Sequence, residues 1–194
     1  MNYLAHAFLS EQKPLSIIGN IMGDFVKGRP SESYDGEILK WIVIHRKIDY
    51  FTDTHSIFRL SKRLISNTRR KYSGIIIDIA FDHFLAKNWL SYSTEDLSGF
   101  INRVYLTLRQ HESVLPERLK NVLPRLVGED WLGSYRTLDG IDLTLNRISR
   151  RFKRDNMLHN SVEEIKSNYD NLEYNFMRFF PKLISYVDEI KMSS

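Results

Sequence analysis

Residues 73–90 carry the feature that most restricts how this chain can fold. Their sequence, SGIIIDIAFDHFLAKNWL, is nearly apolar apart from two aspartates, one histidine and one lysine. A segment that is apolar on every side is stable only when other elements surround it. The run Ile75-Ile76-Ile77 is also compatible with a strand, but the length of the segment and the Ala, Phe and Leu residues that follow favour a buried helix. We therefore expect a central helix.

Helical patterns also dominate the rest of the chain. Apolar residues recur with a helical period in three further stretches, and the pairs Ser93 with Asp96 and Ser161 with Glu164 have the spacing of helix caps. The expected helices cover residues 15–28, 35–51, 56–67 and 93–111, a short helix bounded by Pro116 and Pro124, and a long C-terminal helix from residue 161. We expect one all-α domain over residues 1–194, with about seven to nine helices.

The composition removes several classes of protein. With 194 residues the chain is long enough for one domain with a full core but too short for two of ordinary size. No apolar run approaches the roughly 20 residues that cross a bilayer, and the start MNYLAHAFLSEQKP lacks the basic region of a signal peptide. We expect a cytoplasmic protein with no membrane partner. Because the chain has no cysteine, any metal must bind His, Asp and Glu.

Two segments place acidic and histidine side chains on one helix face. His45, Asp49 and Asp53 recur at intervals of four, and Asp78 and Asp82 are also four apart, with His83 next to them. Ion pairing within the chain would explain the first set. The second set is harder to explain in this way, because burying carboxylates without a positive partner is costly. The partner is either Arg or Lys or a divalent cation, and nearby histidines suit a borderline metal such as Mn²⁺.

Two more polar side chains interrupt apolar surroundings near the N-terminus. Asp24 lies in GNIMGDFVKG, where the glycines would allow a helix or a ligand to approach closely. We expect it to be a further buried carboxylate. His6 lies in YLAHAF, where a histidine satisfied within the core is the simpler explanation. His55, His111 and His159 are expected to be a helix cap or surface residues.

The positive charge is concentrated in two blocks without acidic residues. One runs from Arg59 to Lys71 and the other from Arg147 to Arg154. Arg147, Arg150, Arg151 and Arg154 have the spacing of a single helix face. Such faces can meet nucleic acid, an anionic membrane or an acidic protein. The blocks contain no interleaved aromatic residues and the chain no known nucleic-acid motif, which counts against nucleic acid.

Four segments, in this order and spacing, resemble the bacterial acyl carrier protein phosphodiesterases: MNYLAHAFLS, GNIMGDFVKG, HRKIDYFTD and DIAFDHFLAKNW. The resemblance is close over residues 1 to about 90 and implies an HD-domain-like helical fold. It implies removal of the 4'-phosphopantetheine arm from holo acyl carrier protein, with Mn²⁺ or a similar ion. Asp24 matches the family's essential aspartate, and the other matching polar positions are His6, His45, Asp49, Asp53, Asp82 and His83.

The residues and the resemblance together give one main prediction about the site. We expect Asp24, His45 and Arg46 to act in catalysis, with Arg46 facing the phosphate or pairing with Asp49. The expected metal ligands are His6, Asp24, Asp49, Asp53, Asp78, Asp82 and His83. The two basic blocks would then dock the acidic carrier protein.

Two other functions remain open at this point. An HD-like phosphohydrolase acting on a small nucleotide or phosphate ester would use the same residue types. A helical binding module would instead use the acidic residues in internal ion pairs and the basic faces for RNA or DNA.

Overall fold

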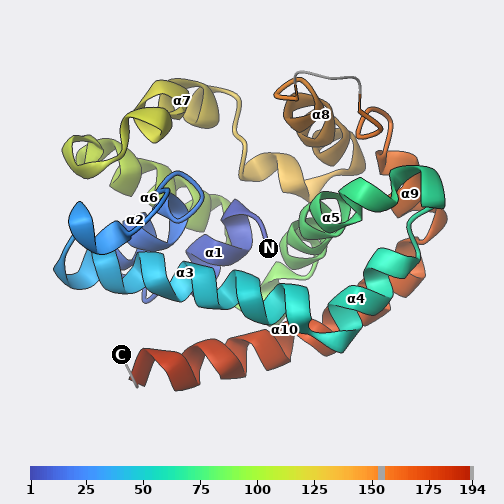
Figure 1. The fold of residues 1–194 in the computed structure, drawn as a ribbon, viewed down its shortest axis with the longest axis horizontal. Coiled ribbons are helices and arrows are strands. Elements are labelled where there is room, and N and C mark those ends of the chain that lie inside the picture. The colour runs from blue at the N-terminus through green and yellow to red at the C-terminus, as the bar shows by residue number, and fades with distance from the viewer. Residues whose placement is uncertain (153–155, 193–194) are drawn as a thin grey trace.

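The computed structural model describes residues 1–152 and 156–192, and this part of the chain is built from helices without strands, so the all-α prediction is confirmed (Figure 1). Its ten α-helices are α1 (Tyr3–Leu9), α2 (Pro14–Met22), α3 (Gly36–Thr54), α4 (Ser56–Arg63), α5 (Ser73–Lys87), α6 (Leu97–Gln110), α7 (Glu117–Gly128), α8 (Leu138–Ser149), α9 (Val162–Ser167) and α10 (Tyr169–Met192). Short 3₁₀ segments cover Pro30–Glu32, Asn67–Tyr72, Trp89–Ser91, Glu112–Val114 and Gly133–Arg136.

Helix α5 occupies the centre, as its sequence predicts. It contacts α1, α4, α8, α9 and α10, and most of its side chains are buried, including Ile76, Phe81 and Phe84. Ile75, Ile76 and Ile77 all lie within this helix, so the strand alternative is wrong. Burial on all sides explains why this segment is almost uniformly apolar. Along one edge of the molecule, α3 and α10 pack side by side (Figure 1).

Helices α2 and α3 pack unusually closely, and Gly19 makes this possible. A Cβ atom at Gly19 would lie 2.6 Å from the Ile38 carbonyl oxygen and 2.7 Å from the Trp41 Cβ. Any larger residue would push the two helices apart. The close packing brings the end of α2, with Asn20 and Gly23, directly against His45 on α3.

Several helix boundaries differ from the predicted ones. Helix α2 ends at Met22 and not at Gly28, because the N–H groups of Phe25 and Val26 both donate to the Met22 carbonyl in a turn. Pro124 lies inside α7 and does not end it. The buried Leu123 and Leu126 on either side hold this helix in place, which outweighs the hydrogen bond that proline cannot make.

The expected long C-terminal helix is two helices, α9 and α10, separated at Asn168. The capping box at its start is also wrong. Ser161 has helical backbone angles and its hydroxyl donates to the Leu158 carbonyl. Glu164 instead accepts hydrogen bonds from Ser66 and Arg69, so tertiary contacts take the carboxylate that the cap would need. Because α1, α8 and this division were not foreseen, the expected helix count was too low.

The basic block from Arg147 to Arg154 does not form one helix face. Helix α8 ends at Ser149 with Arg150 as its C-cap, and Arg154 lies outside the described residues. Arg147 stacks on Trp131 at 4.4 Å from the ring centre and pairs with Glu129 at 3.4 Å. The predicted single face is therefore wrong, and Arg147 is committed to contacts within the chain.

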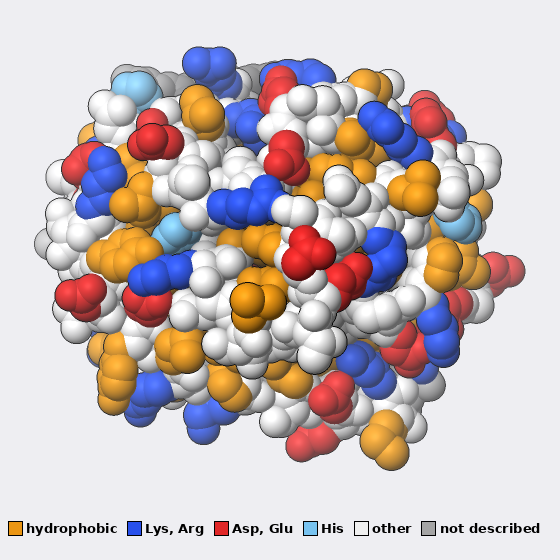
Figure 2. Space-filling model, turned by 180° about the vertical axis from the view of Figure 1, so that it is seen from behind, with side chains coloured by type: hydrophobic (Ala, Val, Ile, Leu, Met, Phe, Trp, Pro, Cys, Tyr) orange, Lys and Arg blue, Asp and Glu red, His pale blue; other side chains and the backbone are white. Residues whose placement is uncertain are grey.

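On the face drawn in Figure 2, lysine and arginine side chains are interspersed with aspartate and glutamate. None of the helices in the described ranges combines the length and the apolar character needed to cross a bilayer.

Candidate active site

Three of the predicted site residues converge between α1 and α3. His6 Nε2 lies 3.2 Å from Asp49 Oδ1, and His45 Nε2 lies 3.1 Å from Asp49 Oδ2. The two imidazole rings stack with their centres 3.9 Å apart. Both histidines are buried, whereas the Asp49 side chain is partly exposed. Ligand atoms from all three residues lie within 4.8 Å of one another, close enough to hold one metal ion.

Asn20 fixes the orientation of both rings. His6 Nδ1 lies 2.9 Å from the Asn20 side-chain oxygen, and His45 Nδ1 lies 2.7 Å from the Asn20 backbone oxygen. The Asn20 amide cannot be reversed without loss, because its Nδ2 donates to the His6 carbonyl and to Ser10 Oγ. Each Nδ1 must therefore donate, which turns both Nε2 atoms toward Asp49. Metal-binding histidines are commonly oriented by such an outer hydrogen bond.

The donor set fits a cation. If Nδ1 carries the proton in each neutral ring, both Nε2 atoms and both Asp49 oxygens are acceptors that face one another. Burial would lower the pKa of His45, but Asp24 and Asp49 outweigh it and raise that pKa to about 9, so without a metal His45 Nε2 carries a proton that it donates to Asp49 and that a bound cation would replace. Burial and the neighbouring His45 lower the pKa of His6, so His6 stays neutral and faces the carboxylate without a proton between them. A divalent cation would satisfy all four atoms at once.

Asp24 lies at the edge of this cluster, in the turn that follows α2. Its Oδ1 is 3.6 Å from His45 Nε2. The turn reaches the histidine because Gly23 has no side chain: a Cβ there would lie 2.1 Å from His45 Cγ. The Asp24 side chain is 46% exposed, so the prediction of a buried carboxylate is wrong. Burial opposes the charge of Asp24, but His45 outweighs it and keeps the pKa of Asp24 lowered.

A cavity of about 290 Å³ lies next to the cluster, on the side of Asp24 and Asp78. Its lining includes Tyr3, Asp24, Asp78, Arg118 and Arg151. Because Asp24 contacts His45 and also lines the cavity, a ligand in this space would reach the histidine cluster through Asp24. The cavity therefore borders the cluster at Asp24 and Asp78, while His6, His45 and Asp49 are not part of its lining.

Asp78 lies beside the cluster but binds the N-terminal amino group. The Met1 nitrogen is 2.8 Å from Asp78 Oδ1 and 3.9 Å from Asp49 Oδ1. Burial would lower the pKa of this amino group, but Asp78 and Asp49 outweigh burial and raise it to about 10. The ammonium group thus supplies the positive partner that the sequence required for one buried carboxylate.

Asp82 and His83 point away from the cluster. Asp82 accepts hydrogen bonds from the backbone N–H groups of Asn2, Leu4 and Ala5, and so holds the start of α1. His83 lies between the Tyr135 carbonyl and the Tyr169 hydroxyl, each at 2.8 Å. Their carboxylate and imidazole groups are satisfied within the fold, and the structure does not bring them together with His6, His45 and Asp49.

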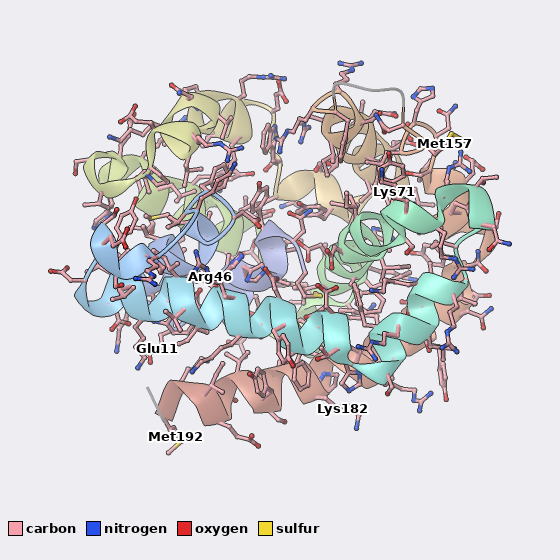
Figure 3. All side chains as sticks on the ribbon, viewed as in Figure 1. Glu11, Arg46, Lys71, Met157, Lys182 and Met192 are labelled. Atoms are coloured by element: carbon pink, nitrogen blue, oxygen red, sulfur yellow. The ribbon has the colours of Figure 1, made fainter. Side chains whose placement is uncertain are left out.

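The remaining predicted residues, Asp53 and Arg46, lie on the outer part of α3. The Asp53 side chain is 70% exposed and 3.8 Å from Lys62. Arg46 donates to the Val26 carbonyl at 3.1 Å and does not pair with Asp49, so it ties the loop after α2 to α3 (Figure 3). His55 caps α4 by accepting from the Ile57 N–H, as expected.

Asn20, Tyr3 and Arg118 belong to the site but were not singled out in the sequence. Asn20 lies within GNIMGDFVKG, and its one signal in the sequence is that it is a polar residue two positions after the pair Ile17-Ile18. Tyr3 and Arg118 carry no local signal, because they reach the cavity only through the packing of α1 and α7.

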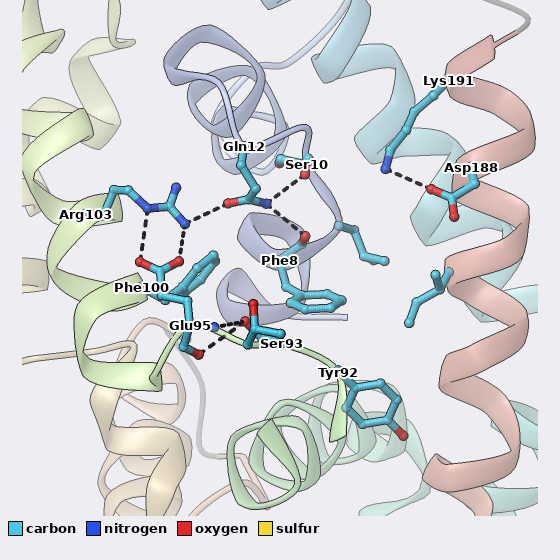
Figure 4. Close-up of a pocket in the computed structure, with 13 residues that line it drawn as sticks. Phe8, Ser10, Gln12, Tyr92, Ser93, Glu95, Phe100, Arg103, Asp188 and Lys191 are labelled. Atoms are coloured by element: carbon cyan, nitrogen blue, oxygen red, sulfur yellow. Dashed lines mark hydrogen bonds and ion pairs between the residues drawn. The ribbon is translucent and has the colours of Figure 1, made fainter. Parts of the chain in front are cut away.

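A larger cavity of about 430 Å³ lies beside α1, α6 and α10 and has a different character (Figure 4). Its charged residues bind one another: Arg103 contacts Glu95 and Gln12, and Lys191 pairs with Asp188. A charged ligand would have to displace these contacts, so this cavity is a weaker candidate for a site than the one above the histidines.

Comparison with known proteins points to one family. Residues 1–183 match the sequence model of the family described as acyl carrier protein phosphodiesterase. Similar proteins that bear this name include those of Klebsiella pneumoniae, 34% identical over 188 residues (95% of this chain and 96% of the relative), and of Photorhabdus laumondii, 33% identical over 185 residues (95% and 93%). The protein of an Enterobacter species is 32% identical over 185 residues (95% and 96%). No solved structure matches the fold, so its relationship to HD-type proteins stays a prediction.

Proposed function

The chain belongs to the acyl carrier protein phosphodiesterase family, and on this premise we propose that it hydrolyses the 4'-phosphopantetheine arm from holo acyl carrier protein with a divalent cation. The observation that carries the cation requirement is the pair of histidines turned by Asn20 toward Asp49, beneath a cavity that Asp24 lines. The cytoplasmic location expected from the sequence stays a prediction.

His6 Nε2, His45 Nε2 and the Asp49 carboxylate would hold the cation. Their mixture of nitrogen and oxygen donors suits a borderline ion such as Mn²⁺. When bound, such an ion lowers the pKa of a water molecule and neutralises charge on phosphoryl oxygens. We leave Asp53, Asp82 and His83 out of the proposed ligand set because each is exposed or satisfied elsewhere.

Asp24 is the residue we propose as the base. It is ionised, half-exposed to the cavity and 3.6 Å from His45. A carboxylate in this position can accept the proton of the attacking water. Arg46 contributes indirectly, because its bond to the Val26 carbonyl holds the loop that presents Asp24.

The basic block from Arg59 to Lys71 would dock the acidic carrier protein. Not all of it is available, because Arg69 is bound to Glu164. Arg59 and Arg63, together with Arg178 from α10, line an open hollow of about 480 Å³. These three guanidinium groups are the proposed contact with acidic side chains of the carrier.

The decisive experiment incubates the purified protein with holo acyl carrier protein and Mn²⁺ and follows the intact mass of the carrier. We expect conversion to the apo form, which a chelator stops and added Mn²⁺ restores. Retention of the arm by an intact carrier, in the presence of folded and Mn²⁺-supplied protein, would refute the proposal. Hydrolysis of nucleotides without action on the carrier would instead favour the nucleotide phosphohydrolase.

A further inference from the structure

Two arginines from distant parts of the chain reach the cavity above the histidine cluster. Arg118 comes from the first turn of α7, and Arg151 follows the end of α8. Both side chains are exposed. Within residues 1–152 and 156–192, neither makes an ion pair with a carboxylate, whereas Arg69, Arg103 and Arg147 all do. The cavity therefore holds two positive charges that the described part of the chain does not neutralise.

Arg151 is also positioned by its neighbours. Its guanidinium lies 5.4 Å from the centre of the Trp131 ring, on which Arg147 also stacks. Arg151 and Tyr3 line both this cavity and a narrower one of about 40 Å³ beside it. An arginine stacked on an aromatic ring loses less freedom when it binds a ligand, because part of its side chain is already held.

The negative charges in the cavity come from different elements than the two arginines. Asp24 belongs to the turn after α2 and Asp78 to α5, whereas the arginines belong to α7 and the end of α8. The carboxylates would repel an anionic ligand unless its charge is met by the arginines. Guanidinium groups can bind two oxygens of a phosphoryl group at once, which gives both affinity and orientation.

We propose that Arg118 and Arg151 bind the non-bridging oxygens of the phosphodiester and so hold the phosphorus within reach of Asp24. This assignment rests on the proposed function and adds the residues that select a phosphoryl substrate. It also separates Arg151 from the docking surface, because a cavity of about 290 Å³ accepts a small group and not the face of a protein.

The test compares Arg118→Met and Arg151→Met with the wild-type protein in the presence of Mn²⁺. Hydrogen bonds to a charged group contribute enough that each change should lower kcat/KM for holo acyl carrier protein by about 10- to 100-fold. Binding of inorganic phosphate, measured by calorimetry, should weaken by a similar factor. Arg118→Lys and Arg151→Lys should recover part of both. Arg109→Met, at an exposed position near the end of α6 and outside both the cavity and the proposed docking surface, should leave phosphate binding unchanged.

Each alternative gives a different result. If both methionine variants bind phosphate as the wild-type protein does, or if the wild-type protein binds none, the assignment is wrong. An increase in KM for the carrier without a change in phosphate affinity would make the arginines docking residues and would also overturn it. If the wild-type protein leaves the carrier intact, the proposed function fails, while the phosphate measurements still decide the role of the arginines. Far-UV circular dichroism checks that the variants are folded.

Discussion

Asn20 connects the two histidines of the candidate centre through one side chain and one backbone carbonyl. Its amide binds His6 and its carbonyl binds His45, so a single residue decides which nitrogen each ring turns toward Asp49. The contact with His45 is possible because Gly23 has no side chain, which leaves room for the His45 ring at the end of α2.

Replacing Asn20 should therefore weaken metal binding without removing a ligand. Loss of an outer hydrogen-bond partner typically reduces metal affinity by about 10- to 100-fold. We expect this for Asn20→Ala, measured as the Mn²⁺ dissociation constant by calorimetry. Asn121→Ala, at an exposed position of α7, is the matched control and should bind Mn²⁺ as the wild-type protein does. Equal affinities for the two variants would contradict the orienting role.

The acidic residues Asp24 and Asp53 were both predicted as metal ligands, but their surroundings in the structure predict different effects on catalysis. Asp24→Asn should lower kcat for the carrier by about 100-fold or more, because an amide cannot accept the proton of water. Asp53→Asn should change kcat less than twofold, since the Asp53 side chain is 70% exposed and forms an ion pair with Lys62 at 3.8 Å. The measurement is release of the phosphopantetheine arm at saturating carrier. A full rate for Asp24→Asn would remove Asp24 from the mechanism.

At the scale of helices, glycines set how closely the elements of the site approach. Gly23→Ala would place a Cβ atom 2.1 Å from the His45 ring. The clash should destabilise the fold by about 1–3 kcal/mol and weaken Mn²⁺ binding, as seen in thermal unfolding and calorimetry. At Gly74, in the first turn of α5, a Cβ would meet nothing within 4 Å. Gly74→Ala should stabilise the protein slightly and leave the metal affinity unchanged. A Gly23→Ala protein with the stability and the Mn²⁺ affinity of the wild-type protein would disprove the tight contact.

Asp82 joins the central helix to the first one. Its oxygens accept three backbone N–H groups at the start of α1, and all the atoms of Asp82 are buried. Asp82→Ala leaves these donors without partners and should reduce the free energy of unfolding by about 3 kcal/mol. Asp170→Ala, at an exposed position in the first turn of α10, should change it by less than about 0.5 kcal/mol. Chemical denaturation measures both. A stable Asp82→Ala protein that binds no Mn²⁺ would restore Asp82 as a ligand.

For the whole molecule, the charge distribution separates the proposed docking surface from the proposed catalytic cavity. Arg59, Arg63 and Arg178 line one hollow, whereas Arg118 and Arg151 line the cavity above the histidines. Figure 1 places α4 on the opposite side of the molecule from α6, the helix that carries Arg109. A long-range attraction from the α4 surface would act on the encounter with an acidic protein more than on the reaction itself.

Reversing one charge on this surface should therefore affect KM and not kcat. Arg63→Glu is expected to raise KM for holo acyl carrier protein several-fold at low salt, with a smaller difference at high salt because ions screen the charges. Arg109→Glu, near the end of α6, carries the same change in net charge and should have a smaller effect. Steady-state rates over a range of salt concentrations test this. Equal effects of the two variants would assign the increase to net charge alone.

The fold class and the types of residue at the candidate site could both be predicted from local patterns in the chain. Helical periodicity is a local property, so the central helix and most other helices could be predicted from spacing. The family motifs likewise contain His6, Asp24, His45 and Asp49, whose side chains lie close together in the structure. Errors at Pro124 and Glu164 arose where packing or a tertiary partner outweighed a local signal.

Which of the polar residues come together depends on contacts between distant parts of the chain. Asp49 and Asp82 both belong to carboxylate pairs four residues apart on a helix, yet Asp49 meets two histidines and Asp82 holds the start of α1. The difference depends on which neighbouring helix each one faces, and that in turn depends on the close approach of α2 to α3 at Gly19 and Gly23. Spacing along one helix fixes the face on which a side chain lies, but the partner of that face is set by contacts between segments distant in the chain.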